Sequence, residues 1–103
     1  MNALTITLIQ TNLYWENKEA NLAMLKEKIM AIEEKTEIII LPEMFSTGFS
    51  MKPELFAETM VGSTVMWMRQ IAAAKRIILT GSMIIALFFN NHTSGKYYAL
   101  CCC

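Results

Sequence analysis

The chain has 103 residues, a formal net charge of +0 at pH 7 and a hydrophobic fraction of 54%. This length allows one small domain. The balanced charge gives no electrostatic basis for binding nucleic acid or an anionic membrane surface. Charged residues make up 17% of the chain, below the roughly 25% of an average domain. The chain therefore has more apolar surface to cover than its size easily buries, as expected for part of a larger core or for a surface that meets a partner.

Two segments bear on localisation, residues 77–89 and the N-terminus. Residues 77–89 are mostly apolar, but Thr80, Gly81 and Ser82 interrupt them, and the segment is shorter than the ~20 residues that span a bilayer. The N-terminus has no cationic stretch before an apolar run and does not resemble a signal peptide. We therefore expect a cytoplasmic protein with no membrane or nucleic-acid partner.

The beginning of the chain predicts a strand and then a helix. In residues 4–10, Leu4, Ile6 and Leu8 alternate with threonines, so we expect a strand packed mainly on one face. A helical period starts after Asn17, whose side-chain oxygen suits an N-cap. The apolar positions of this helix recur every three or four residues and are Leu22, Leu25, Ile29 and Ile32.

The middle of the chain predicts a second strand and a second helix. Residues 37–41 (EIIIL) are a continuous apolar run, typical of a strand covered on both faces, and the proline that follows ends it. Residues 53–58 are expected to form a short helical turn. A second helix, capped by Ser63 or Thr64, is expected to run through Lys75, with a buried face of Val65, Met68, Ile71 and Ala72.

The last part of the chain predicts a β-hairpin. Residues 77–79 begin a third strand, Gly81 interrupts it, and residues 83–85 continue it. The polar residues 90–95 form a turn, and residues 96–100 return as the hairpin partner. The order β-α-β-loop-α-β-β predicts an α/β fold.

A carboxylate, Glu43, follows the second predicted strand after Pro42. Ligand clefts of α/β proteins lie at the carboxyl ends of buried strands, and a carboxylate held there suits a general base. A Pro-Glu pair after a strand is more often an ordinary loop carboxylate. Position by itself therefore leaves both interpretations open.

The residues around Glu43 resemble a known family. Residues 41–45 (LPEMF), followed by residues 47–50 (TGFS), are similar to the glutamate motif of the carbon–nitrogen hydrolases, the nitrilase superfamily. Residues 15–17 (WEN) and 45–49 (FSTGF) are most similar to the bacterial omega-amidase-like branch. On this resemblance, Glu43 occupies the family's catalytic glutamate position.

The extent of the resemblance, residues 4–85, sets the expected fold. It implies that residues 1–103 are a partial carbon–nitrogen hydrolase domain with an atypical ending. The complete family domain is a four-layer α-β-β-α sandwich, and this chain is expected to supply its N-terminal portion. Intact family members are expected to form homo-oligomers.

The resemblance also implies a mechanism. In the family, a cysteine thiolate attacks the carbon of an amide or nitrile, and water then hydrolyses the covalent acyl intermediate. Glu43 would be the general base, a lysine would stabilise the oxyanion, and Phe45 is a candidate to line the substrate pocket. The branch implies ω-amides of 2-oxo acids, such as 2-oxoglutaramate, as the small-molecule substrates, with no metal or organic cofactor.

The chain departs from the family pattern near its end. The family's lysine and cysteine motifs are expected beyond residue 103, and Lys96 is assigned to the turn. Residues 101–103, all cysteines, come too early to be the nucleophile, and His92 is expected to be a surface residue of a polar turn. We therefore expect the chain to be inactive by itself. The alternative is a non-catalytic interaction module that docks on a partner through its surplus apolar surface.

Overall fold

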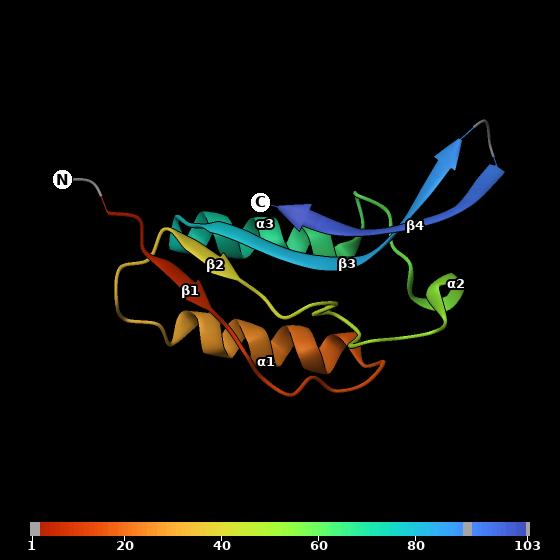
Figure 1. Cartoon of the computed structure of the whole chain (residues 1–103). Helices are drawn as coiled ribbons and strands as arrows, with labels where there is room; N and C mark the ends of the chain where they lie inside the picture. Colours follow the sequence, from red (N-terminus) through yellow and green to blue (C-terminus); the bar gives the residue numbers. More distant parts are fainter. Residues whose placement is uncertain (1–2, 90–91, 103) are drawn as a thin grey trace.

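The computed structural model describes residues 3–89 and 92–102. In chain order the elements are β1 (Ile6–Leu8), α1 (Lys18–Met30), β2 (Ile38–Ile40), α2 (Pro53–Phe56), α3 (Ser63–Lys75), β3 (Ile78–Phe89) and β4 (His92–Cys102). The strands lie side by side in the order β1-β2-β3-β4 (Figure 1). The strands β1, β2 and β3 are parallel, and β4 is antiparallel to β3. The α/β fold expected from the sequence is confirmed.

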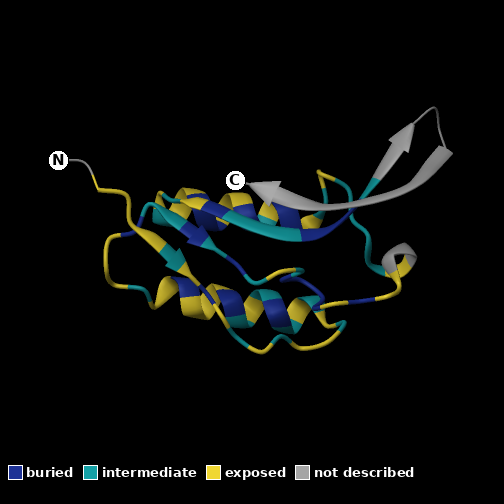
Figure 2. Ribbon diagram, in the orientation of Figure 1, coloured by how far each residue is buried: buried dark blue, intermediate teal, exposed yellow. Residues whose placement is uncertain are grey.

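Helices α1 and α3 pack on the same face of the sheet. Strand order follows chain order, so crossovers of one hand bring both helices to one side. Leu25 and Ile29 of α1 and Met68 of α3 belong to one buried cluster with Ile39 and Leu79 of the sheet. Figure 2 shows buried stretches along both helices and the strands between them. The chain thus forms one helix layer and one sheet layer, which is half of the expected four-layer sandwich.

Helix α1 begins as its sequence predicts, but it ends at Met30, before the predicted position Ile32. The Asn17 side chain accepts a hydrogen bond from the backbone N–H of Ala20 at 3.2 Å, which satisfies one of the free donors of the first turn. Leu25 and Ile29 are fully buried, whereas Leu22 is only partly buried. A polar residue, Asn21, shares the buried face of this helix.

Helix α3 has the predicted end and the predicted buried face, but its beginning differs. Its N-cap is Gly62, which has no side chain that can cap. The Glu58 carboxylate takes over this role from outside the helix. It accepts from the backbone N–H of Thr64 at 3.1 Å and from the hydroxyls of Thr64 and Ser63. Pairing of Glu58 with Ile85 of β3 brings the carboxylate to the helix end.

One face of the sheet is open, which corrects the expectation that β2 is covered on both faces. The alternating residues Leu4, Ile6 and Leu8 are 63%, 49% and 63% exposed, while Ile9 on the other face is buried. The strand β2 is covered on one face rather than both, because α1 and α3 both pack on the face opposite the exposed one. The alternation predicted the strand correctly, but the helices cover the face that bears the threonines.

The hairpin of β3 and β4 corrects two further expectations. Gly81 does not interrupt β3, because a register shift between Gly81 and Ile84 absorbs the irregularity and the strand continues. The predicted hairpin partner is confirmed. His92, which was expected in a turn, is the first residue of β4 and pairs with Phe89.

The final cysteines are only partly described. Cys101 pairs with Gly81 and Cys102 with Thr80 through the backbone of β4. Cys103 lies outside the described residues, as do the side chains of His92 and Lys96. The expectations for these side chains therefore stay predictions.

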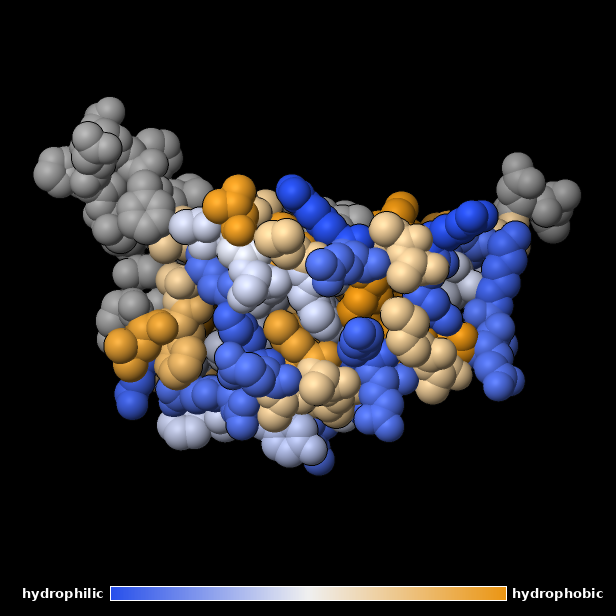
Figure 3. Space-filling model, turned by 180° about the vertical axis from the view of Figure 1, so that it is seen from behind, coloured by the Kyte–Doolittle hydropathy of each residue, from blue (hydrophilic) through white to orange (hydrophobic). Residues whose placement is uncertain are grey.

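The surface on the side turned away from the viewer in Figure 1 is mixed in character. Seen from behind, hydrophilic side chains alternate with hydrophobic ones (Figure 3). Within residues 3–89 and 92–102, no helix is long and apolar enough to cross a membrane.

Candidate active site

Glu43 lies where β2 has just ended, at the carboxyl edge of the parallel strands. Leu41 still donates its N–H to the carbonyl of Thr80 at 2.8 Å, so the chain stays attached to β3 up to the turn at residues 43–47. The Glu43 side chain is exposed and makes no hydrogen bond to the described residues. Its carboxylate is therefore accessible to a reacting group, at the sheet edge where α/β proteins bind ligands.

Strand β3 holds the first half of this turn. The hydroxyl of Ser82 accepts from the N–H of Met44 at 2.8 Å, and the carbonyl of Ser82 accepts from the N–H of Phe45 at 3.2 Å. Met44 has a φ of 48°, which is uncommon for a residue other than glycine. Such backbone strain persists only where surrounding contacts fix it, and it concentrates at functional sites.

Helix α1 and the segment before it hold the second half of the turn. The Asn21 amide nitrogen donates to the carbonyl of Ser46 at 2.9 Å, and the N–H of Glu16 donates to the carbonyl of Thr47 at 2.6 Å. The N–H of Gly48 closes the turn onto the carbonyl of Met44 at 2.7 Å. Gly48 has a φ of 72°, a conformation that favours glycine. The turn that carries Glu43 is therefore fixed from two directions.

Phe45 anchors the turn in the core. Its side chain is 0% exposed and stacks on Trp67, with ring centroids 6.0 Å apart and an interplanar angle of 24°. Gly81 leaves room for the ring, since an added Cβ there would lie 2.7 Å from Phe45 Cδ1. Phe45 thus fixes the backbone beside Glu43, while contact of its ring with substrate stays a prediction.

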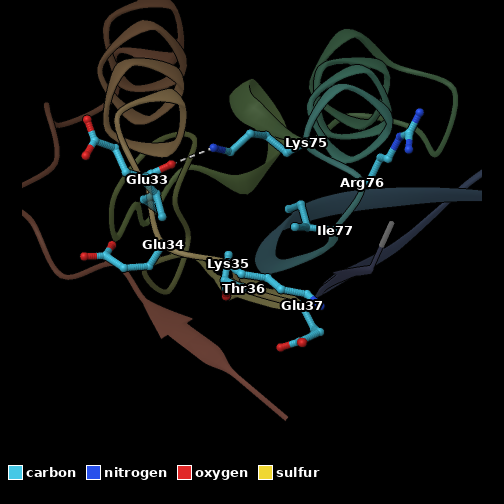
Figure 4. A pocket seen from close by; sticks show the side chains of 9 residues that line it. Glu33, Glu34, Lys35, Thr36, Glu37, Lys75, Arg76 and Ile77 are labelled. Carbon is cyan, nitrogen blue, oxygen red and sulfur yellow. Dashed lines mark hydrogen bonds between the residues drawn. The ribbon is translucent and has the colours of Figure 1, made fainter. Parts of the chain in front are cut away.

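A charged hollow of about 300 Å³ lies at the opposite edge of the sheet (Figure 4). Its lining comes from residues 32–37, before β2, and residues 75–77, before β3. Lys75 spans part of it and donates to the carbonyl of Ile32, two residues beyond the end of α1, at 2.9 Å. Because Glu43 follows β2, this hollow is not part of its site.

Another hollow, of about 350 Å³, lies between the start of α1 and the segment around α2. Lys18 and Glu58 line it and form an ion pair of 3.7 Å, and Lys18 also donates to the Ser63 hydroxyl at 2.9 Å. Lys18 and Glu58 are thus already paired with each other. Glu43 does not line this hollow either.

Sequence reasoning identified Glu43 and Phe45 but missed two residues that hold the turn, Asn21 and Ser82. Asn21 carried a usable signal, because it lies four residues before Leu25 and so falls on the buried face of the helix. A polar side chain on that face needs hydrogen-bond partners. Ser82 carried no comparable signal, since its contact depends on how β3 pairs with β2.

Comparison with known proteins decides the family. Residues 5–102 match the carbon-nitrogen hydrolase family. The chain belongs to the carbon–nitrogen hydrolases. The match spans nearly the whole sequence and includes the turn with Glu43.

Named relatives agree with this family. The omega-amidase YafV of Yersinia enterocolitica is 32% identical over 87 residues, which are 82% of this chain and 32% of that protein. The omega-amidase YafV of Escherichia coli K12 is 34% identical over 86 residues, with 82% of this chain and 32% of that protein covered. The chain therefore spans about a third of the length of the curated relatives that it matches.

A solved structure gives the same result. XC1258 from Xanthomonas campestris is a CN-hydrolase superfamily protein whose crystal structure contains an arsenic adduct in the active site. It superposes with a TM-score of 0.76 at 27% identity, covering 99% of this chain and 40% of that one. The sheet and helices described above are thus a portion of the carbon–nitrogen hydrolase fold.

Proposed function

We propose that Glu43 is the general base of an amide-hydrolysing site of the omega-amidase kind. The observation that carries this proposal is the Glu43 turn itself. The exposed carboxylate of Glu43 belongs to a turn whose backbone is hydrogen-bonded to Ser82 of β3 and to Asn21 of α1. General bases need this combination of accessibility and fixed position. The similarity to omega-amidases adds the class of reaction.

The proposed reaction has two steps. Glu43 takes the proton of a cysteine thiol, whose sulfur attacks the amide carbon. The carbon–nitrogen bond then breaks, and the nitrogen takes the proton from Glu43 and leaves as ammonia. Next, Glu43 takes a proton from water, whose oxygen attacks the acyl carbon. The carbon–sulfur bond breaks, and the proton on Glu43 passes to the leaving sulfur, which restores the thiol.

The proposal also covers the substrate, the thiol nucleophile and the cation that stabilises the oxyanion. The substrates are ω-amides of small 2-oxo acids, such as 2-oxoglutaramate, and the products are ammonia and a dicarboxylate. The thiol and the cation that stabilises the oxyanion come from outside these 103 residues. The chain is therefore expected to be inactive by itself.

A chimera tests this function. This chain replaces the matching third of the Yersinia omega-amidase YafV, and ammonia release from 2-oxoglutaramate is measured. We expect turnover by the chimera and no turnover by the isolated chain. Turnover by the isolated chain that disappears in Glu43→Gln would refute the proposed division of the site.

The open face of the sheet supports a second candidate function, a non-catalytic interaction module. Its exposed apolar residues are Leu4, Ile6, Leu8 and Ile78. The proposed partner is a full-length omega-amidase relative, which this face would contact. Exposed apolar surface of this kind is typical of protein interaction sites.

Matched lysine variants test the second function. Ile6→Lys places a charge on the open face, whereas Met30→Lys changes a similarly exposed apolar residue of α1. Binding of the chain to the relative is measured by sedimentation. We expect Ile6→Lys to abolish binding and Met30→Lys to retain it. A wild-type chain that stays monomeric beside the relative would rule out the module.

A further inference from the structure

The strongest unassigned feature is a buried polar side chain, that of Asn21 on α1. It is 0% exposed and lies on the same helix face as Leu25 and Ile29. An amide among these apolar residues loses its contacts with water, which is unfavourable unless protein groups replace them. Asn21 therefore needs partners, and they identify its role.

Three hydrogen bonds satisfy the Asn21 amide. Its oxygen accepts from the N–H of Tyr14 at 2.7 Å, and its nitrogen donates to the carbonyl of Tyr14 at 2.7 Å and to the carbonyl of Ser46 at 2.9 Å. Both N–H donors of the amide are thus used. Each goes to a different backbone segment, one before α1 and one within the Glu43 turn.

These bonds belong to a row of hydrogen bonds, here called the seam, that joins the start of α1 and the residues before it to residues 46–49. The N–H of Glu16 donates to the carbonyl of Thr47 at 2.6 Å, and the indole N–H of Trp15 donates to the carbonyl of Phe49 at 2.9 Å. Within this seam, Asn21 is the member whose side chain is fully buried and whose helix is anchored in the core. Its side chain is therefore the one in this seam that is held within the core.

We propose that Asn21 is a positioning residue of the Glu43 site, in which a buried carboxamide fixes the Glu43 turn to helix α1. This inference rests on the proposed role of Glu43. Ser82 holds the turn directly after Glu43, and Asn21 holds it at Ser46. Without the Asn21 contact, Ser46 loses its donor while Ser82, the Glu16 N–H and the Phe45 ring still hold the turn, and the carboxylate shifts relative to the reacting atoms.

The variant Asn21→Asp isolates the donor function. Aspartate has nearly the same shape and retains an acceptor for the N–H of Tyr14. It turns an acceptor oxygen toward the carbonyls of Ser46 and Tyr14 in place of the donor, so both contacts become repulsive. Asn12→Asp makes the same chemical change at an exposed position and serves as the matched control.

Turnover by the chimera gives the first measurement. We expect Asn21→Asp to lower kcat by roughly 10- to 100-fold, because misplacing a reacting group by ~1 Å costs about 100-fold. KM should stay nearly constant, since the effect is on the transition state. Asn21→Ser, which introduces no charge, should show the same split. Wild-type kcat in both variants would overturn the inference.

Amide hydrogen exchange in the 103-residue chain gives the second measurement. We expect faster exchange at Glu16 and Gly48 in Asn21→Asp, with Leu25 and Leu79 as protected as in the wild type. Equal loss of protection at all four positions in both variants would assign Asn21 to general stability and overturn the inference. Unchanged exchange at Glu16 and Gly48 would also overturn it.

The two proposals fail in different ways. If Glu43→Gln retains turnover in the chimera, the proposed function fails. If Glu43→Gln loses turnover while both Asn21 variants retain it, the positioning role of Asn21 fails and the proposed function stands.

Discussion

The Ser82 hydroxyl accepts the backbone N–H of Met44 at 2.8 Å, so a side chain of β3 holds the residue next to Glu43. The Ser82 carbonyl holds the following N–H, that of Phe45, at 3.2 Å. Glu43 itself belongs to a turn after β2. Its location therefore depends on a neighbouring strand as much as on its own.

Ser82→Ala removes the acceptor for the Met44 N–H. We expect the free energy of unfolding to fall by about 1–3 kcal/mol, because a partly buried donor loses its partner. Urea denaturation measures this change. Ser82→Thr retains the hydroxyl and should restore most of the stability. An alanine variant as stable as the wild type would show that water replaces the serine.

Gly81→Ala tests the fit of the Phe45 ring against β3. An added Cβ would lie 2.7 Å from Phe45 Cδ1 and 3.0 Å from Leu41 Cβ. We expect a loss of about 1–3 kcal/mol from overpacking, measured by thermal or urea unfolding. In the background of Phe45→Leu, which removes the ring, the same substitution should cost less. Equal costs in both backgrounds would contradict this packing.

Glu58→Gln tests the cap of α3. The Glu58 carboxylate accepts from the Thr64 N–H and from the hydroxyls of Ser63 and Thr64, and it pairs with Lys18. We expect Glu58→Gln to lower the free energy of unfolding by about 1–2 kcal/mol, as for loss of an N-cap. Glu34→Gln, at an exposed position, should leave the urea midpoint unchanged. If both variants unfold at the same midpoint, the cap contributes nothing.

Local patterns predicted much of this fold. The spacing of Leu25 and Ile29 predicted α1, and that of Met68 and Ile71 predicted α3, because a helical period depends only on neighbouring positions. The second strand and the final hairpin followed from apolar runs and a polar turn. Glu43 was identified through its motif.

The remaining features depend on tertiary contacts. Alternation in residues 4–10 predicts two distinct faces but not which face the helices cover, and here they cover the side of Ile9. The cap of α3 comes from Glu58, which pairing with Ile85 brings to the helix. Both results depend on how the strands and helices pack, which local sequence patterns do not specify.

The most direct measurement is ammonia release from 2-oxoglutaramate by the chimera with and without Glu43→Gln. Urea unfolding of the wild-type 103-residue chain and of its Glu43→Gln variant accompanies it. Glu43 is exposed and bonds to no described residue, so the urea midpoint should stay unchanged. Turnover should fall by roughly 10²- to 10⁴-fold, as for loss of a general base. Turnover that persists in Glu43→Gln would contradict the catalytic role of Glu43.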